Sequence, residues 1–108
     1  MAFMRAASTS EVPLGKMKGV RVGDKDVLIA NVGGSYYAIR GLCTHAAGVL
    51  SNGTLDGNIV TCPKHGTQFD VTNGKSVRGP KILGMRMKTK DEPSYPVKIE
   101  GADILIDV

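Results

Sequence analysis

The chain has 108 residues, which is enough for one domain with a modest core and too few for two packed domains. The net charge of +4 fits an acidic protein partner as well as nucleic acid, but the basic residues are scattered along the chain, so we expect no nucleic-acid binding. No segment is apolar enough over its length for a signal peptide or a membrane span, which predicts a cytoplasmic protein with no membrane partner.

Short runs rich in β-branched residues, separated by turn residues, recur along the whole chain and predict an all-β domain. Residues 8–13 predict a turn with one helical turn. Two-residue turn signals predict hairpins, at Gly23-Asp24, Gly33-Gly34, Asn73-Gly74 and Gly101-Ala102. The expected strands cover residues 3–6, 19–22, 26–32, 35–40, 58–61, 68–71, 75–77, 85–90, 97–100 and 103–108.

The segment from Met85 to Lys90 alternates apolar and basic residues, which predicts a half-buried strand with a charged outer face. The next residues, 91–96, contain two prolines and are expected to form a loop. Residues 41–83 are expected to form a small subdomain, inserted in a β base made of residues 1–40 and 84–108.

Every cysteine and histidine of the chain lies in one of two short segments, Cys43-Thr44-His45 and Cys62-Pro63-Lys64-His65. Four such ligands in two Cys/His pairs predict a metal centre. Zinc takes four such ligands as a structural staple, although Cys-x-His is tighter than the usual zinc knuckle. A disulfide between Cys43 and Cys62 is a further alternative.

A cluster of two irons and two sulfides needs two protein ligands on each iron. When one iron takes both cysteines and the other both histidines, each segment gives one ligand to each iron. Two ferric ions, two sulfides, two thiolates and two neutral imidazoles have a total charge of zero. Such a centre accepts an electron more easily than one with four thiolates.

The segments Cys43-Thr44-His45 and Cys62-Pro63-Lys64-His65-Gly66 resemble the cluster motif of the Rieske family. The order of meander, insert and hairpin also resembles the Rieske fold, over essentially the whole chain. This resemblance implies an antiparallel β-sandwich with an inserted cluster-binding subdomain. It implies one [2Fe-2S] cluster, with Cys43 and Cys62 on the buried iron and His45 and His65 on the outer iron near the surface.

The chain departs from the respiratory-chain branch of that family. Proteins of that branch carry two further cysteines that join the two loops, and the matching positions here are Gly48 and Lys64, which cannot form that bond. Those proteins also place a Ser and a Tyr hydroxyl near the cluster sulfurs, where this chain has Thr67 and Phe69. Hydrogen bonds to sulfur stabilise the reduced state, so the loss of one predicts a low-potential, ferredoxin-like protein.

The dipeptide Gly79-Pro80 resembles the proline loop that covers the cluster in this family. No further Cys or His remains for a mononuclear iron site, so we expect an electron carrier rather than an enzyme. We expect a monomer that passes electrons between a reductase and an oxygenase or other redox partner, which docks at the His45/His65 edge. The alternatives are a small Rieske subunit of a larger reductase or oxygenase complex, and a zinc-stabilised interaction module.

Overall fold

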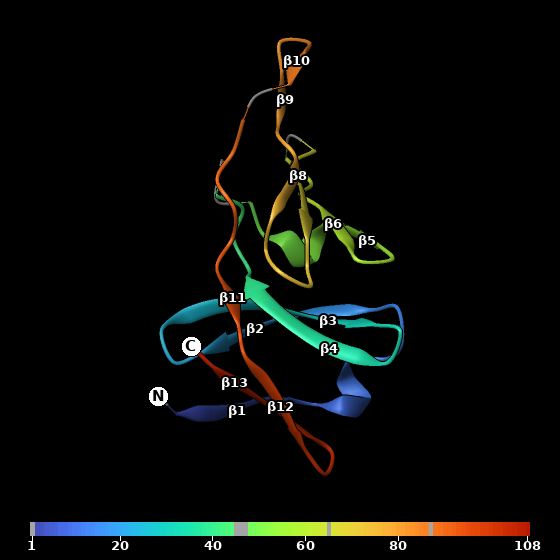
Figure 1. Ribbon diagram of the computed structural model, residues 1–108, viewed down its shortest axis with the longest axis vertical. Coiled ribbons are helices and arrows are strands. Elements are labelled where there is room, and N and C mark those ends of the chain that lie inside the picture. The colour runs from blue at the N-terminus through green and yellow to red at the C-terminus, as the bar shows by residue number, and fades with distance from the viewer. Residues whose placement is uncertain (1, 45–47, 65, 87) are drawn as a thin grey trace.

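The protein is built from small antiparallel sheets that lie one above the other along its longest axis (Figure 1). The computed structural model describes residues 2–44, 48–64, 66–86 and 88–108. The molecule measures 47 × 26 × 19 Å along its principal axes. Both chain ends lie in its lower half in Figure 1. The part of the chain that the structure describes contains no helix long and apolar enough to cross a membrane.

The central sheet has four strands in the order β11-β4-β3-β2. Their bounds are Met17–Val22 (β2), Lys25–Val32 (β3), Ser35–Arg40 (β4) and Ser94–Tyr95 (β11). Strands β2, β3 and β4 pair in sequence order and form the expected meander. The turns between them use glycines with positive φ, at Gly23 and at Gly33-Gly34, which only glycine adopts without strain.

Below the central sheet lies a sheet made from both ends of the chain, in the order β1-β13-β12 (Figure 1). Its strands are Phe3–Ser8 (β1), Val97–Glu100 (β12) and Asp103–Asp107 (β13). Strand β1 leads into a short 3-10 helix, Thr9–Glu11 (η1), whose Glu11 carboxylate accepts a 2.8 Å hydrogen bond from the Ser8 backbone N–H. This bond caps the turn that was expected over residues 8–13.

Above the central sheet lies a third sheet in the order β5-β6-β7-β8, beyond which a two-stranded hairpin, β9-β10, extends (Figure 1). The strands are Thr54–Asp56 (β5), Ile59–Thr61 (β6), Gln68–Asp70 (β7), Ser76–Arg78 (β8), Lys81–Ile82 (β9) and Met85–Arg86 (β10). A second 3-10 helix, Leu50–Asn52 (η2), precedes β5. The hairpin between β7 and β8 was predicted from Asn73-Gly74, and the structure confirms it.

Strand β3 divides the core between two layers. Its residues Val27, Leu28, Ile29 and Ala30 are all buried to 1% exposure or less. Successive side chains of a strand point to opposite faces, so Val27 and Ile29 pack toward β1 and β13, while Leu28 and Ala30 pack into a cluster that contains both cysteines. Burial of the Val, Leu and Ile side chains contributes about 1.5–3 kcal/mol each. One strand therefore holds the lower sheet on one face and the cysteine-bearing loops on the other.

The expected all-β antiparallel fold is confirmed, but two local predictions are wrong. Among the described residues of 85–90, only Met85–Arg86 form a strand (β10), residues 88–90 form none, and Met85 is 66% exposed rather than half-buried. The loop over residues 91–96 contains β11, which pairs Ser94 with Ile39 and Tyr95 with Ala38. Prolines on either side do not prevent this pairing, because β11 is an edge strand.

Candidate metal centre

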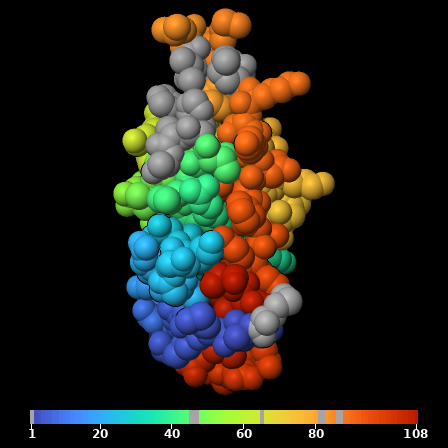
Figure 2. Space-filling model, turned by 90° about the vertical axis from the view of Figure 1, so that its left-hand side faces the viewer, coloured from blue at the N-terminus to red at the C-terminus, as the bar shows by residue number. Residues whose placement is uncertain are grey.

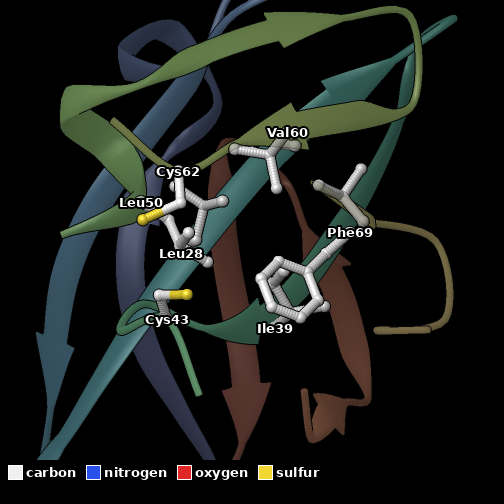
Figure 3. Packing of buried hydrophobic residues seen from close by; sticks show 9 residues of the cluster. Leu28, Ile39, Cys43, Leu50, Val60, Cys62 and Phe69 are labelled. Atoms are coloured by element: carbon white, nitrogen blue, oxygen red, sulfur yellow. The ribbon is translucent and has the colours of Figure 1, made fainter. Parts of the chain in front are cut away.

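The two cysteines lie in the same apolar cluster, although they come from different segments of the chain. Cys43 follows β4 and Cys62 follows β6, and each is only 2% exposed. They share this cluster (Figure 3) with side chains of the central sheet, of η2, and of the third sheet and the residue after β7, namely Leu28, Ala30, Ile39, Leu50, Val60, Phe69 and Val71. The sequence predicted that these two segments act together, and the fold brings both cysteines to one place.

Each cysteine stands at the base of a loop that backbone hydrogen bonds close. The Cys43 N–H donates to the Gly48 carbonyl at 2.8 Å, and the Leu50 N–H donates to the Gly41 carbonyl at 2.9 Å. In the second loop, the Cys62 N–H donates to the Thr67 carbonyl at 2.7 Å. These bonds hold each cysteine in place at the start of its loop.

The two loops touch directly at Gly48. A Cβ on Gly48 would lie 2.8 Å from the Cys62 Sγ and 3.2 Å from the Lys64 Cγ. Real side-chain carbons do not approach a sulfur this closely, so only glycine lets the first loop lie against the second cysteine. Gly48 and Lys64 are the positions singled out from the sequence as facing each other across the loops, and the structure brings them together. Lys64 is itself exposed.

The hydroxyl of Thr67 is buried and has no hydrogen-bond partner among the described residues. Thr67 is 0% exposed and follows the loop that begins at Cys62. An unpaired buried hydroxyl costs about 1–3 kcal/mol, which an acceptor placed beside it would recover. Sulfide between the loops is such an acceptor, so the donor set here fits a cluster that brings its own sulfides. Phe69 is also 0% exposed and offers no hydroxyl.

Three further predictions concern this centre. His45 and His65, the two predicted histidine ligands, lie outside the described residues. Pro80 is buried and follows β8, and that it covers the cluster stays a prediction. No disulfide joins Cys43 to Cys62, which removes that alternative. Within residues 2–44, 48–64, 66–86 and 88–108 there is no group of three or more metal-binding side chains, and the two cysteines are the described part of the predicted ligand set.

The sequence did not predict that residues 89–90 form hydrogen bonds with the first cysteine loop. The Thr44 hydroxyl donates a 2.8 Å hydrogen bond to the Lys90 carbonyl and lies 3.0 Å from the Thr89 hydroxyl. Because Thr44 has one hydroxyl proton, Thr89 is the donor of the second bond. No sequence signal connects residues 45 positions apart, so only the fold reveals this link.

The same segment continues into a buried carboxylic acid, Glu92. Its backbone N–H donates a 2.7 Å hydrogen bond to the Gly74 carbonyl, but neither carboxyl oxygen has a hydrogen-bond partner within the described chain. Burial raises the pKa of Glu92 to about 8, and the positive charge of Arg40 opposes this rise. The carboxyl is therefore mostly neutral at pH 7.

Comparison with known proteins agrees with this arrangement. The family described as "Rieske [2Fe-2S] domain" matches residues 2–95. The ferredoxin component of the naphthalene 1,2-dioxygenase/salicylate 5-hydroxylase systems of Ralstonia sp. is 39% identical over 104 residues, which cover 96% of this chain and 93% of that protein.

Solved structures show the same architecture. The Sphingomonas yanoikuyae B1 ferredoxin is 29% identical, with a TM-score of 0.81 and 99% coverage of both chains. A chain from the complex of reduced oxygenase and oxidized ferredoxin in carbazole 1,9a-dioxygenase is 28% identical, with a TM-score of 0.78 and coverage of 96% and 91%.

Proposed function

The chain belongs to the Rieske [2Fe-2S] domain family, and on this premise we propose that Cys43, His45, Cys62 and His65 are the four protein ligands of its cluster. The observation that carries this proposal is the burial of Cys43 and Cys62 in one cluster, at the bases of two closed loops. The two histidines follow at the motif spacing in those loops and are the chain's only histidines.

A bound [2Fe-2S] cluster supplies one-electron chemistry, since it accepts an electron and returns it. Residues beside the two cysteines supply space and a hydrogen-bond donor for the cluster. Gly48 leaves room beside the Cys62 sulfur, and the Thr67 hydroxyl is held ready to donate toward sulfur. The surrounding apolar side chains of Leu50 and Phe69 keep water from the buried thiolates.

The protein is an electron carrier of the ferredoxin type, as are its relatives, which are named as ferredoxin components of dioxygenase systems. Its partners are accordingly the redox proteins of such a system. We propose that it passes electrons from a reductase to an oxygenase as a cytoplasmic monomer, and that the partner docks at the His45/His65 edge. We propose in addition that the chain divides into a cluster-binding part, approximately residues 41–83, and a base formed by residues 1–40 and 84–108. The hairpin β9-β10 crosses this boundary, and its strand Met85–Arg86 lies with the cluster-binding part.

We further propose that the reduction potential is low for this family. Thr67 is the one hydroxyl at the two positions where the respiratory-chain branch has two, because Phe69 fills the second. Fewer hydrogen bonds to sulfur leave the more negative reduced state less stabilised. A redox titration that gives a potential as positive as that of the quinol-oxidising proteins would refute this proposal.

Absorption spectroscopy of the purified chain, combined with metal analysis, tests the cluster. We expect a coloured protein whose broad visible bands bleach with dithionite, and two irons and two sulfides per chain. A Cys43→Ser variant should lose the colour, whereas a serine at the exposed Lys64 should keep it. A colourless protein that contains zinc would overturn the proposal in favour of a zinc-stabilised module.

A further inference from the structure

The end of the molecule farthest from the chain termini carries an exposed apolar tip. The hairpin β9-β10 extends beyond the third sheet (Figure 1), and Figure 2 shows the same segment at the upper extreme of the surface. At its turn, Leu83 is 97% exposed, and Met85 beside it is 66% exposed. Neither side chain contributes to the core, so the packing of the fold does not explain them.

The backbone at this tip is unfavourable for a leucine. Leu83 has a φ of +52°, the only positive φ of a residue other than glycine in the described chain, and Gly84 follows with a φ of +79°. A two-residue hairpin loop with positive φ at both positions normally carries Asn-Gly or Asp-Gly. Leucine adopts this conformation at a cost in free energy and exposes its side chain to water. A strained, fully exposed apolar residue indicates a contact outside the chain.

The positive charge of the protein is concentrated toward this end. Residues 62–90 contain seven of the chain's 14 Lys and Arg residues and one of its ten Asp and Glu residues. The rest of the chain carries slightly more acidic than basic residues. Within this stretch Lys64, Lys88 and Lys90 are exposed, and Lys88 and Lys90 belong to the segment that leaves the hairpin. This half of the molecule therefore attracts an acidic surface and orients the chain as it approaches.

The segment that leaves the hairpin is attached to the first cysteine loop. Thr44, the residue after Cys43, bonds to Thr89 and to the Lys90 carbonyl. A protein that binds the tip and the neighbouring lysines is thereby held beside the loop of a proposed cluster ligand. This is the place where an electron acceptor must lie.

We propose that the β9-β10 tip, together with Lys88 and Lys90, is the docking element for the oxygenase component of a dioxygenase system. The oxygenase would present an acidic rim around an apolar recess that receives Leu83 and Met85. This inference rests on the proposed function. It adds which structural element contacts the oxygenase and which apolar and charged side chains the oxygenase recognises. A second copy of the chain is disfavoured as the occupant, because two surfaces of the same positive charge repel each other.

Stopped-flow mixing of the reduced chain with the oxidised naphthalene 1,2-dioxygenase oxygenase tests this proposal. Asparagine suits the positive φ of position 83, so Leu83→Asn keeps the hairpin and removes only the apolar side chain. We expect its second-order rate constant to fall about tenfold, the loss expected when one leucine is no longer buried on binding. The matched control is Leu14→Asn, at a 67% exposed leucine in the base, which should react at the wild-type rate.

Charge reversal tests the electrostatic part. Lys88→Glu should slow the reaction at low ionic strength and flatten its salt dependence, whereas Lys25→Glu, at an exposed site in the base, should change neither. All four variants should keep the wild-type visible spectrum and reduction potential.

Wild-type rates for both Leu83→Asn and Lys88→Glu would overturn the docking proposal. So would a wild-type chain that reduces the small acidic haem protein cytochrome b5 but not the oxygenase. A chain without a cluster is recognised from its spectrum before mixing; that result refutes the proposed function, and the docking proposal falls with it.

Discussion

Replacing Glu92 with glutamine should change how the stability of the protein depends on pH. Glutamine has nearly the same shape as a protonated glutamic acid and cannot ionise. Glu92 is 4% exposed and its two carboxyl oxygens have no hydrogen-bond partner within the described chain, so in the folded protein nothing nearby compensates its charge except the field of Arg40. The variant therefore isolates the cost of ionising this one group.

The size of the effect follows from the pKa. The pKa of Glu92 rises from 4.5 to about 8 because burial penalises the charged form. The unfolded chain loses this proton first, so the stability of the wild type is highest below about pH 4.5 and falls as the pH rises toward 8. This pKa shift corresponds to at most about 5 kcal/mol in the free energy of unfolding. After a discount for solvent screening, we expect about 2 kcal/mol between pH 5.5 and pH 9.

Thermal unfolding of the oxidised, cluster-loaded protein measures this effect. The difference between Glu92→Gln and the wild type should be small near pH 5.5 and should favour the variant near pH 9 by about 10 °C in Tm. Subtracting the two curves cancels the pH dependence of the cluster itself. Glu100→Gln, at an exposed glutamate paired with Lys98, is the control and should give a difference independent of pH. Parallel wild-type and Glu92→Gln curves from pH 5.5 to pH 9 would refute the reasoning.

Three further substitutions test the packing around the loops. In Gly48→Ala the new Cβ would lie 2.8 Å from the Cys62 Sγ, so we expect about 1–3 kcal/mol of destabilisation and less iron per chain; full iron content at wild-type stability would contradict this. Thr67→Val should stabilise the cluster-free protein by about 1 kcal/mol and lower the reduction potential of the loaded protein by about 50 mV, whereas an unchanged potential would show that the hydroxyl does not face the cluster. In Gly74→Ala the Cβ would collide with the Glu92 carbonyl at a φ of +79°, so denaturant unfolding should show a loss of more than about 2 kcal/mol; wild-type stability would mean that this contact is not tight.

Much of the fold was predictable from local patterns. The meander of β2, β3 and β4 follows from apolar runs separated by glycine turns, and the hairpin of β7 and β8 follows from Asn73-Gly74. Strands β5, β9 and β11 have two or three residues, too few to show a period, and were missed. Strands β6, β7 and β8 are as short, but the β-branched run Ile59–Thr61 and the Asn73-Gly74 turn indicated them. The alternation from Met85 to Lys90 predicted burial wrongly at Met85, because none of the described sheets covers the tip of the hairpin.

The candidate site was predictable in its chemistry but not in its surroundings. Two Cys/His pairs with no spare ligand predict the four ligands, and that set stays a prediction. The fold places two of them, Cys43 and Cys62, in one cluster. The unpaired hydroxyl of Thr67 and the buried carboxyl of Glu92 depend on tertiary burial, which no local pattern encodes. The bond from Thr44 to Lys90 joins residues 46 positions apart and could not be anticipated from either segment alone.

Electron–nuclear double resonance of the dithionite-reduced chain, with 15N-labelled histidine, tests the central claim most directly. The chain has two histidines, so every strong nitrogen coupling to the cluster from labelled histidine must come from His45 or His65. We predict two strongly coupled 15N nuclei in the wild type and one in the cluster-loaded fraction of His45→Ala and of His65→Ala. A reduced cluster without any strong 15N coupling in the wild type would contradict the assignment of these four ligands.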